Sequence, residues 1–270
     1  MIKTNFHTHT QFCDGKNTAE EIVLCALSKN FSDLGFSIHS FLKEDTDIVA
    51  SPQCIEDYRI EIARLKSKYD GKIDILCGIE QDYFSEKSLG FDYIIGSVHN
   101  VRKNGKLLPI DVSKEFTKQI VDEFYGGDFD ALAEDYFLLV ADVVSRTNAD
   151  IIGHFDLVSK YSEQLNFGQS ERYINAAKTA IQKLVPFNKP FEINTGAMSR
   201  GVKSEPYPSS EILEMIFECG GKILFSSDCH DADFLDFGFD MAEKLAYNIG
   251  FREQAIIKGN KIEYIPIDIK

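Results

Sequence analysis

The chain has 270 residues, 44% of them hydrophobic and 27% charged, so its apolar content suffices for a core of ordinary size. Its 29 basic and 43 acidic residues give a formal net charge of −14, which disfavours binding along the phosphate backbone of a nucleic acid. No run approaches the roughly 20 apolar residues that a membrane helix requires, and the first residues lack the basic and apolar regions of a secretory signal. We therefore expect a cytoplasmic protein that binds neither nucleic acid nor membrane.

The cysteines and the organisation of the chain favour a single domain with reduced thiols. None of the six cysteines belongs to a Cys-x-x-Cys pair, so a structural zinc knuckle is not indicated. Without a secretory signal, reduced thiols are expected. The sequence contains no internal repeat, low-complexity tract or Pro/Gly-rich linker, so we expect one domain over residues 1–270, as a monomer or a small homo-oligomer.

Apolar and β-branched runs recur along the whole chain and predict buried strands, with helical segments between most of them. Strands that alternate with helices indicate a parallel sheet. Seven such repeats favour a closed or nearly closed α/β barrel over an open doubly wound sheet, and no Gly-x-Gly-x-x-Gly follows the first strand, which argues against dinucleotide binding. The predicted strands are residues 2–6, 33–38, 73–79, 93–98, 150–153, 190–193 and 222–226.

Start and stop signals place helices between these strands. Thr18 opens a Thr-x-x-Glu capping box, and a Ser-Pro pair at 51–52 predicts a helix that runs to residue 69. An Asn-Gly turn signal predicts an excursion above the barrel over residues 101–109. Apolar spacing and terminal signals predict further helices over residues 128–146, 170–184 and 209–219.

Side chains that can bind metals follow the ends of the predicted strands, where parallel α/β barrels gather their functional groups. Imidazole and carboxylate suit zinc, manganese or iron(II). Residues two apart on a strand point to the same side, so the pairs of a His-x-His or an Asp-x-His motif can share one ion. None of the six histidines falls in the predicted helices 52–69 and 128–146, as some would if they were merely structural. The candidates are His7, His9, His39, Glu80, His99, His154, Asp228 and His230, with Asp14 just after the first strand.

These motifs, taken together and in this order, resemble those of the polymerase-and-histidinol-phosphatase (PHP) superfamily. The resemblance spans residues 1 to about 240 and is carried by His7-Thr-His9, Phe12-Cys-Asp-Gly15, Gly78-Ile-Glu80, Gly96-Ser-Val-His99, Gly153-His154 and Ser227-Asp-Cys-His230. Within the superfamily, the length and the segments 192–196 and 198–201 look most like histidinol-phosphate phosphatases.

The resemblance implies a distorted (β/α)7 barrel, similar to a TIM barrel, that holds three divalent ions at the C-terminal ends of its strands. His7, His9, Glu80 and Asp228 would bind the first ion. Glu80, as a bridge, would bind the second together with His99 and His154. Asp14, His39 and His230 would bind the third, although many members of the superfamily have a histidine where Asp14 stands.

The implied activity is the hydrolysis of a phosphomonoester, with L-histidinol phosphate of histidine biosynthesis as the expected small-molecule substrate. Bound divalent ions lower the pKa of water and supply a nucleophile at neutral pH. Glu80, Asp228 and His230 are the candidate catalytic residues. Arg200 can offer a bidentate fork to phosphate, and Lys160 is a second candidate cation. The candidate partners for the ammonium group of the substrate are Glu115 and Asp111.

The sequence is also compatible with other functions. A related phosphoesterase would act on phosphotyrosine or on nucleotides, although the acidic charge and the lack of a basic, aromatic-rich stripe disfavour nucleic acid. A metal-dependent amide or lactone hydrolase also uses His-x-His and a late aspartate, but usually has a lysine where Glu80 would bridge, and His39 and His230 would then be surplus. A barrel that binds a partner without catalysis is disfavoured by the complete set of ligands.

Overall fold

A computed structural model describes residues 2–44, 50–259 and 261–268, and within them seven parallel strands form one sheet. The strands follow each other in sequence order across the sheet, and each pairs in parallel with the next. They agree with the seven predicted strands. Their bounds are β1 (Thr4–Asn5), β2 (Asp33–His39), β3 (Asp74–Asp82), β4 (Tyr93–Ser97), β7 (Ile151–Ile152), β8 (Pro190–Asn194) and β9 (Lys222–Ser226).

The first and last strands meet and close the sheet into a barrel. Thr8 forms an isolated parallel bridge with Cys229. The His9 N–H donates to the Cys229 carbonyl at 2.8 Å, and the Cys229 N–H donates to the His7 carbonyl at 3.1 Å. Because β1 and β7 contain only two residues each, the barrel is distorted. The predicted (β/α)7 barrel is therefore confirmed.

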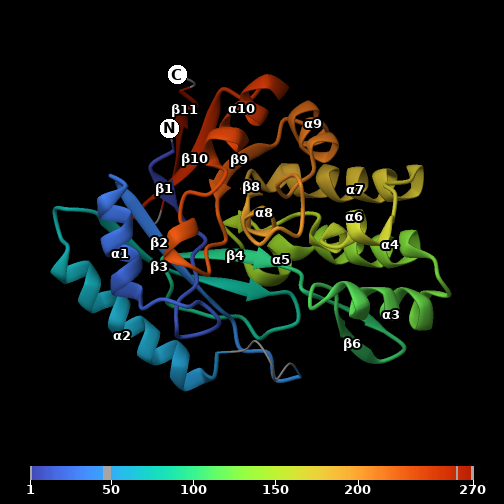
Figure 1. Ribbon diagram of the computed structural model, residues 1–270, viewed down its shortest axis with the longest axis horizontal. Helices are drawn as coiled ribbons and strands as arrows, with labels where there is room; N and C mark the ends of the chain where they lie inside the picture. Colours follow the sequence, from blue (N-terminus) through green and yellow to red (C-terminus); the bar gives the residue numbers. More distant parts are fainter. Residues whose placement is uncertain (1, 45–49, 260, 269–270) are drawn as a thin grey trace.

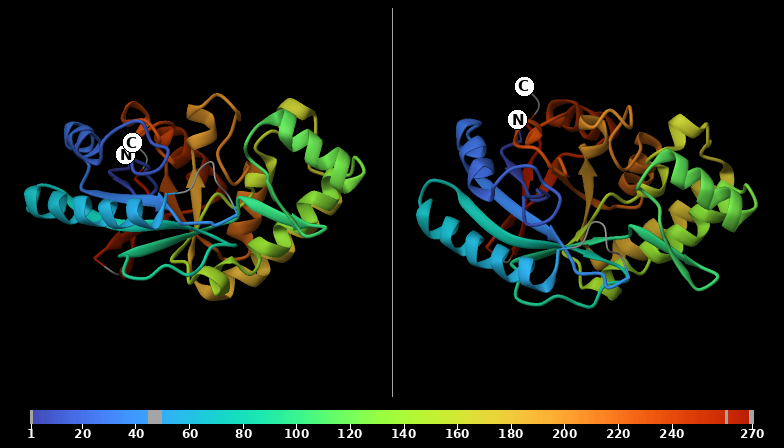
Figure 2. Two further views of the ribbon diagram at one scale, coloured as in Figure 1. Left: turned by 90° about the horizontal axis from the view of Figure 1, so that it is seen from below. Right: turned by 60° about the horizontal axis from the view of Figure 1, so that its bottom comes forward.

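Helices cover the outside of the barrel, as a parallel sheet with two apolar faces requires. Figure 2 shows α1 (Ala19–Ser28) and α2 (Pro52–Lys68) on one side, and α3 (Lys114–Tyr125) with α4 (Phe129–Val140) on the other. The remaining helices are α5 (Val143–Thr147), α6 (Ser162–Leu165), α7 (Glu171–Leu184), α8 (Gly196–Ser199), α9 (Ser210–Glu218) and α10 (Phe239–Ile249), with short 3-10 turns η1 (Leu157–Ser159), η2 (Val185–Phe187) and η3 (Ala232–Phe234).

Several predicted helix signals have the expected geometry. The Thr18 side chain accepts a hydrogen bond from the Glu21 N–H, and Glu21 reaches back to the Thr18 N–H, which completes the capping box. Ser51 caps α2, which begins at Pro52. The Asn-Gly turn joins β5 (Asn100–Lys103) to β6 (Lys106–Pro109) in an antiparallel hairpin.

The single helix predicted over residues 128–146 is wrong, because the segment forms two helices, α4 and α5. The Asp142 N–H donates to the Leu139 carbonyl three residues back, instead of the Leu138 carbonyl four residues back. This tighter turn interrupts the α-helical pattern. The apolar spacing continues on both sides of the break, so the sequence pattern does not reveal it.

Tyr93 fills the barrel interior below the strand ends. Its hydroxyl lies 2.6 Å from the Phe6 carbonyl and 2.8 Å from the Phe36 carbonyl, so its single proton is shared between two acceptors that link β4 to the first two strands. A Cβ atom added at Gly35 or Gly78 would lie 2.4 or 2.2 Å from the Tyr93 side chain. Both glycines are therefore needed to make room for this ring.

The C-terminal segment adds a hairpin that the sequence did not predict. Strands β10 (Glu253–Lys258) and β11 (Lys261–Pro266) pair in antiparallel and lie beside β9 and the N-terminus (Figure 1). Ala255, Ile256 and Ile257 are buried in one apolar cluster with the interior residues of the barrel, including Phe6 and Tyr93. The hairpin thus buries apolar surface of the barrel away from the strand ends that carry the histidines. Across residues 2–44, 50–259 and 261–268, no helix has both the length and the apolar character of a membrane span.

Candidate metal centre

The nine predicted ligands converge at one end of the barrel. His39 is the last residue of β2, and Glu80 lies near the end of β3. The other ligands lie in the segments that leave β1, β4, β7 and β9. Side chains more than 200 positions apart in the chain are thereby brought into contact, as the interaction between Asp14 and His230 illustrates.

Two histidines and two carboxylates form the first ligand set. Nε2 of His7 lies 3.3 Å from Glu80 Oε2 and 3.6 Å from Asp228 Oδ1. Nε2 of His9 lies 3.5 Å from Glu80 Oε2 and 3.3 Å from Asp228 Oδ1. Both Nε2 atoms are buried and have no hydrogen-bond partner. Buried nitrogens without a partner, facing two carboxylates, fit a divalent cation between them.

Glu80 connects the first set to a second one. Its Oε1 lies 3.1 Å from Nε2 of His99 and 2.9 Å from Nε2 of His154. The two oxygens of one buried carboxylate therefore face two different pairs of histidines. This arrangement fits the bridging role that the sequence predicted for Glu80.

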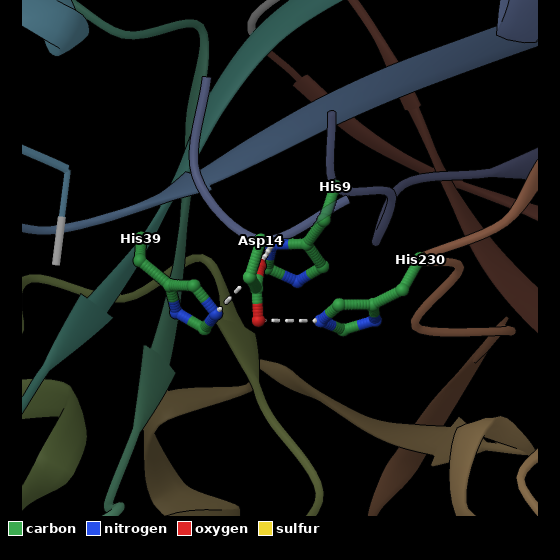
Figure 3. A group of neighbouring side chains, drawn as sticks. All are labelled: His9, Asp14, His39 and His230. Carbon is green, nitrogen blue, oxygen red and sulfur yellow. Dashed lines mark hydrogen bonds and ion pairs between the residues drawn. The ribbon is translucent and has the colours of Figure 1, made fainter. Parts of the chain in front are cut away.

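Asp14 is the centre of the third set, which Figure 3 shows. Its Oδ1 lies 3.5 Å from Nε2 of His39, and its Oδ2 lies 3.1 Å from Nε2 of His230. The His9 ring stacks on both His39 and His230, with ring centroids 4.4 and 4.2 Å away. An aspartate at this position thus reaches both histidines, and its side chain is 37% exposed, so the third set is the most open to solvent.

Hydrogen bonds at Nδ1 select the tautomer of two of the histidines. Nδ1 of His7 lies 2.6 Å from a Glu192 oxygen, and Nδ1 of His99 lies 3.2 Å from an Asp82 oxygen. Nδ1 of His230 lies 2.9 Å from the Asp228 carbonyl but also 3.3 Å from Nη1 of Arg200, which can only donate, so these contacts do not select its tautomer. An acceptor at Nδ1 keeps the proton on that nitrogen and leaves the Nε2 lone pair for a metal ion.

Glu192 and Asp82 contact His7 and His99, and the sequence analysis predicted neither contact. Glu192 was singled out only as part of a segment that resembles histidinol-phosphate phosphatases. A carboxylate within the predicted buried strand 190–193 was the available signal for Glu192, and the spacing of two residues from Glu80 was the signal for Asp82.

The charges of the centre depend strongly on each other. Burial raises the pKa of Glu80, but His7 and His99 lower it, and the net pKa lies well below the usual range. Burial lowers the pKa of His99, but Glu80 raises it, and the net pKa is about 10. Burial together with His230 and His39 lowers the pKa of His9 to about 3, so His9 is neutral and can act as a ligand. When no metal ion is bound, protonated histidines can balance the carboxylates that metal ions would otherwise neutralise.

Asp228 is held in a backbone conformation that non-glycine residues rarely adopt. Its φ is 46°, and the other non-glycine residues with positive φ in the described ranges are all asparagines. Such strain persists where the surroundings fix it, often at functional sites. Arg200 provides part of this constraint, because its Nη2 lies 3.2 Å from Asp228 Oδ2 and its Nη1 lies 3.4 Å from the Asp228 carbonyl.

A cavity of about 410 Å³ opens above the ligands. Arg200 and Lys160 both line it, so the structure brings both predicted phosphate-binding residues to the site. Asp111 lines it too, and its Oδ2 lies 3.2 Å from the Lys160 Nζ. Glu115 is not among the lining residues; it lies in the first turn of α3, and its side chain is 73% exposed. Of the two candidate partners for an ammonium group, the structure therefore places only Asp111 in the cavity.

Comparisons with known proteins agree with this geometry. The "Probable histidinol-phosphatase" of Schizosaccharomyces pombe is 26% identical over 276 residues, covering 93% of this chain and 88% of that protein. The protein of the same name from Deinococcus radiodurans is 28% identical over 258 residues, covering 91% of this chain and 93% of that protein.

Two solved structures share the fold. The putative histidinol phosphatase hisK of Listeria monocytogenes has a TM-score of 0.76 and 22% identity, covering 88% of this chain and 99% of that one. The histidinol phosphate phosphatase of Lactococcus lactis, complexed with zinc, L-histidinol and phosphate, has a TM-score of 0.72 and 22% identity, covering 97% and 98%. The PHP domain matches residues 5–196, and the chain therefore belongs to the PHP domain family.

Proposed function

We propose that this protein is a metal-dependent phosphomonoesterase that hydrolyses L-histidinol phosphate to L-histidinol and phosphate, in the cytoplasmic synthesis of histidine. One observation carries the proposal: three ligand sets share Glu80 or lie against it, at the base of a cavity that Arg200 and Lys160 also line. Two relatives named for this activity, aligned over at least 91% of the chain, support the choice of substrate.

The ligand sets would hold three divalent ions, with zinc, manganese or iron as candidates. His7, His9, Glu80 and Asp228 would hold the first, Glu80, His99 and His154 the second, and Asp14, His39 and His230 the third. Zinc in the histidinol phosphate phosphatase of Lactococcus lactis supports zinc as one choice. Such ions neutralise phosphate oxygens and make a water molecule nucleophilic at neutral pH.

The remaining residues of the cavity would orient the substrate. Arg200 can present a planar, bidentate fork to the phosphoryl oxygens, and its contacts to Asp228 fix its direction. Lys160 adds a second positive charge, held by Asp111. Burial raises the pKa of Asp111, but Lys160 and His99 lower it, and the net pKa is below the usual value. Asp111 is therefore anionic and can accept hydrogen bonds from the substrate ammonium.

The direct test is phosphate release from L-histidinol phosphate, before and after treatment with a chelator. We expect turnover that chelation abolishes and that added zinc or manganese restores. Tyrosine phosphate and a nucleoside monophosphate serve as comparison substrates. Phosphate release from tyrosine phosphate without release from histidinol phosphate would reverse the choice of substrate, and turnover that survives chelation would remove the metal from the proposal.

A further inference from the structure

Glu192 lies on β8, directly beneath the first ligand set, and is fully buried. Its Oε1 lies 2.6 Å from Nδ1 of His7 and also accepts a hydrogen bond from the Ser226 hydroxyl. Its Oε2 accepts from the His154 backbone N–H at 2.8 Å and from the Asn194 side-chain amide at 3.0 Å. One carboxylate therefore touches two strand ends that carry metal ligands, although no ligand set includes it.

All of these partners can donate a hydrogen bond, so the position suits a side chain that only accepts hydrogen bonds. An ionised carboxylate has two acceptor oxygens and no donor. Four donors thus face the two oxygens of Glu192, and its Oε1 keeps the His7 proton on Nδ1. The opposite nitrogen, Nε2, is the buried atom without a partner that faces Glu80 and Asp228.

We propose that Glu192 is the positioning residue of the first metal site, holding His7 in the Nδ1–H tautomer so that its Nε2 lone pair can bind the ion. The inference rests on the proposed metal dependence. It adds a residue that does not touch the metal but determines whether one ligand of the first set is available. Partners of this kind typically change metal affinity by about 10–100-fold when they are removed.

The substitution Glu192→Gln tests this proposal because one hydrogen-bond partner of Glu192 determines which way the glutamine amide must turn. The His154 backbone N–H can only donate, so the glutamine amide must turn its oxygen toward that N–H. The glutamine NH₂ group then faces Nδ1 of His7. Two donors cannot share a hydrogen bond, so Nδ1 must become the acceptor and the His7 proton must move to Nε2. That proton would occupy the lone pair that the metal needs.

Zinc affinity is the first measurement, made on the full chain with zinc alone and a competing chelator. We expect the wild-type protein to bind zinc at the first set about 10–100 times more tightly than Glu192→Gln does. Ser226→Ala is the matched control, because it removes a neutral donor from the same Oε1 and leaves the carboxylate in place. This variant should keep the wild-type zinc affinity. Thermal unfolding of the zinc-free proteins checks that both variants fold.

The tautomer of His7 is the second measurement, because loss of a negative charge alone would also weaken zinc binding. In ¹⁵N NMR spectra, His7 of the zinc-loaded wild-type protein should carry its proton on Nδ1. The zinc-free Glu192→Gln protein should carry it on Nε2. If Glu192→Gln does not fold, the zinc-loaded wild-type spectrum still decides, since a proton on Nε2 of His7 in that state would overturn the proposal.

The outcomes separate this inference from the proposed function. If the wild-type protein binds zinc and hydrolyses histidinol phosphate while Glu192→Gln keeps its zinc affinity, Glu192 has no positioning role and the proposed function stands. Weaker zinc binding with the proton still on Nδ1 would assign the loss to charge and would also overturn the tautomer proposal. If the wild-type protein binds no zinc, manganese or iron, both proposals fail.

Discussion

Oε1 of Glu80 lies 2.9 Å from Nε2 of His154, although Glu80 belongs to β3 and His154 follows β7, and β4 separates these two strands in the sheet. Because the other oxygen of Glu80 faces His7 at 3.3 Å, one side chain determines the spacing between the first and second ligand sets. Two ions bound at a fixed spacing can contact the attacking and the leaving oxygen of one phosphoryl group.

Substitution of His99 tests whether the second set is needed for turnover. His99→Ala removes the Nε2 atom that lies 3.1 Å from Glu80 Oε1 and leaves the second set with Glu80 and His154. We expect turnover of histidinol phosphate to be abolished in a protein that still folds, whereas the zinc-free variant should unfold at a lower temperature than the wild type at pH 7, because the positive charge of His99 beside Glu80 is lost. A fully active His99→Ala protein would count against the whole scheme.

Arg200→Lys tests the recognition of phosphate. Lysine keeps the positive charge but cannot form the bidentate fork, so it loses at least one charge-assisted hydrogen bond, worth about 1.5–3 kcal/mol. We expect the KM for histidinol phosphate and the inhibition constant of inorganic phosphate to rise together by roughly 10-fold or more. Steady-state kinetics measure both values. A change in kcat with neither constant altered would instead place Arg200 outside the phosphate site.

Asp111→Asn tests whether the cavity recognises the ammonium group. Loss of the anionic partner should lower kcat/KM for histidinol phosphate by roughly 10–100-fold. An aryl phosphate without an ammonium group should be affected much less, and it reports any change caused by releasing Lys160. Glu115→Gln is the control. Its exposed side chain lies outside the cavity, so this substitution should leave kcat/KM for histidinol phosphate unchanged. Equal losses for both substrates would assign Asp111 to holding Lys160 alone.

Gly78→Ala tests the packing of the barrel interior. A Cβ atom at this position would lie 2.2 Å from the Tyr93 ring, which cannot move away freely because its hydroxyl donates to the carbonyls of Phe6 and Phe36 with one shared proton. We expect the free energy of unfolding to fall by about 1–3 kcal/mol, measured from the midpoint of denaturant unfolding. Gly168→Ala is the matched control, since nothing lies within 4 Å of its added Cβ and its φ is not positive. Equal stability of the two variants would contradict the account of Tyr93.

The strands, and the positions of the candidate ligands at their ends, could be predicted from the sequence because their signals are local. Each strand is an apolar run, and His39 and Glu80 stand where such runs end. The partners of the ligands could not be predicted in the same way. His7 and Glu192 are 185 positions apart, so their contact exists only once the barrel has closed. Nothing near Glu192 in the sequence shows which nitrogen it would face.

The missed elements have a similar explanation. The pairing of β10 with β11 is favoured because Ala255, Ile256 and Ile257 cover apolar residues of a completed barrel. Burial of this kind overrides local preference, and a short apolar run alone does not distinguish a strand of the barrel from a hairpin packed against it. Likewise, the sequence offers Glu115 and Asp111 as two carboxylates in the same segment and gives no reason to choose between them. Only the fold places Asp111 against Lys160.

Metal ions and protons should compete for the same nitrogens. In the zinc-free protein, burial lowers the pKa of His99, but Glu80 raises it, and the net pKa of about 10 lies above the ordinary value of 6.5. Proton binding by His99 therefore stabilises the zinc-free fold fully below about pH 6.5, and this contribution is lost as the pH rises through about 10. Because a ligating imidazole must give up that proton, zinc binding at pH 7 should release protons, and fewer should be released as the pH approaches 10. Titration calorimetry in buffers with different ionisation enthalpies measures the number released. A binding enthalpy that does not depend on the buffer would show that the histidines are already neutral, contrary to the charge balance inferred for the zinc-free centre.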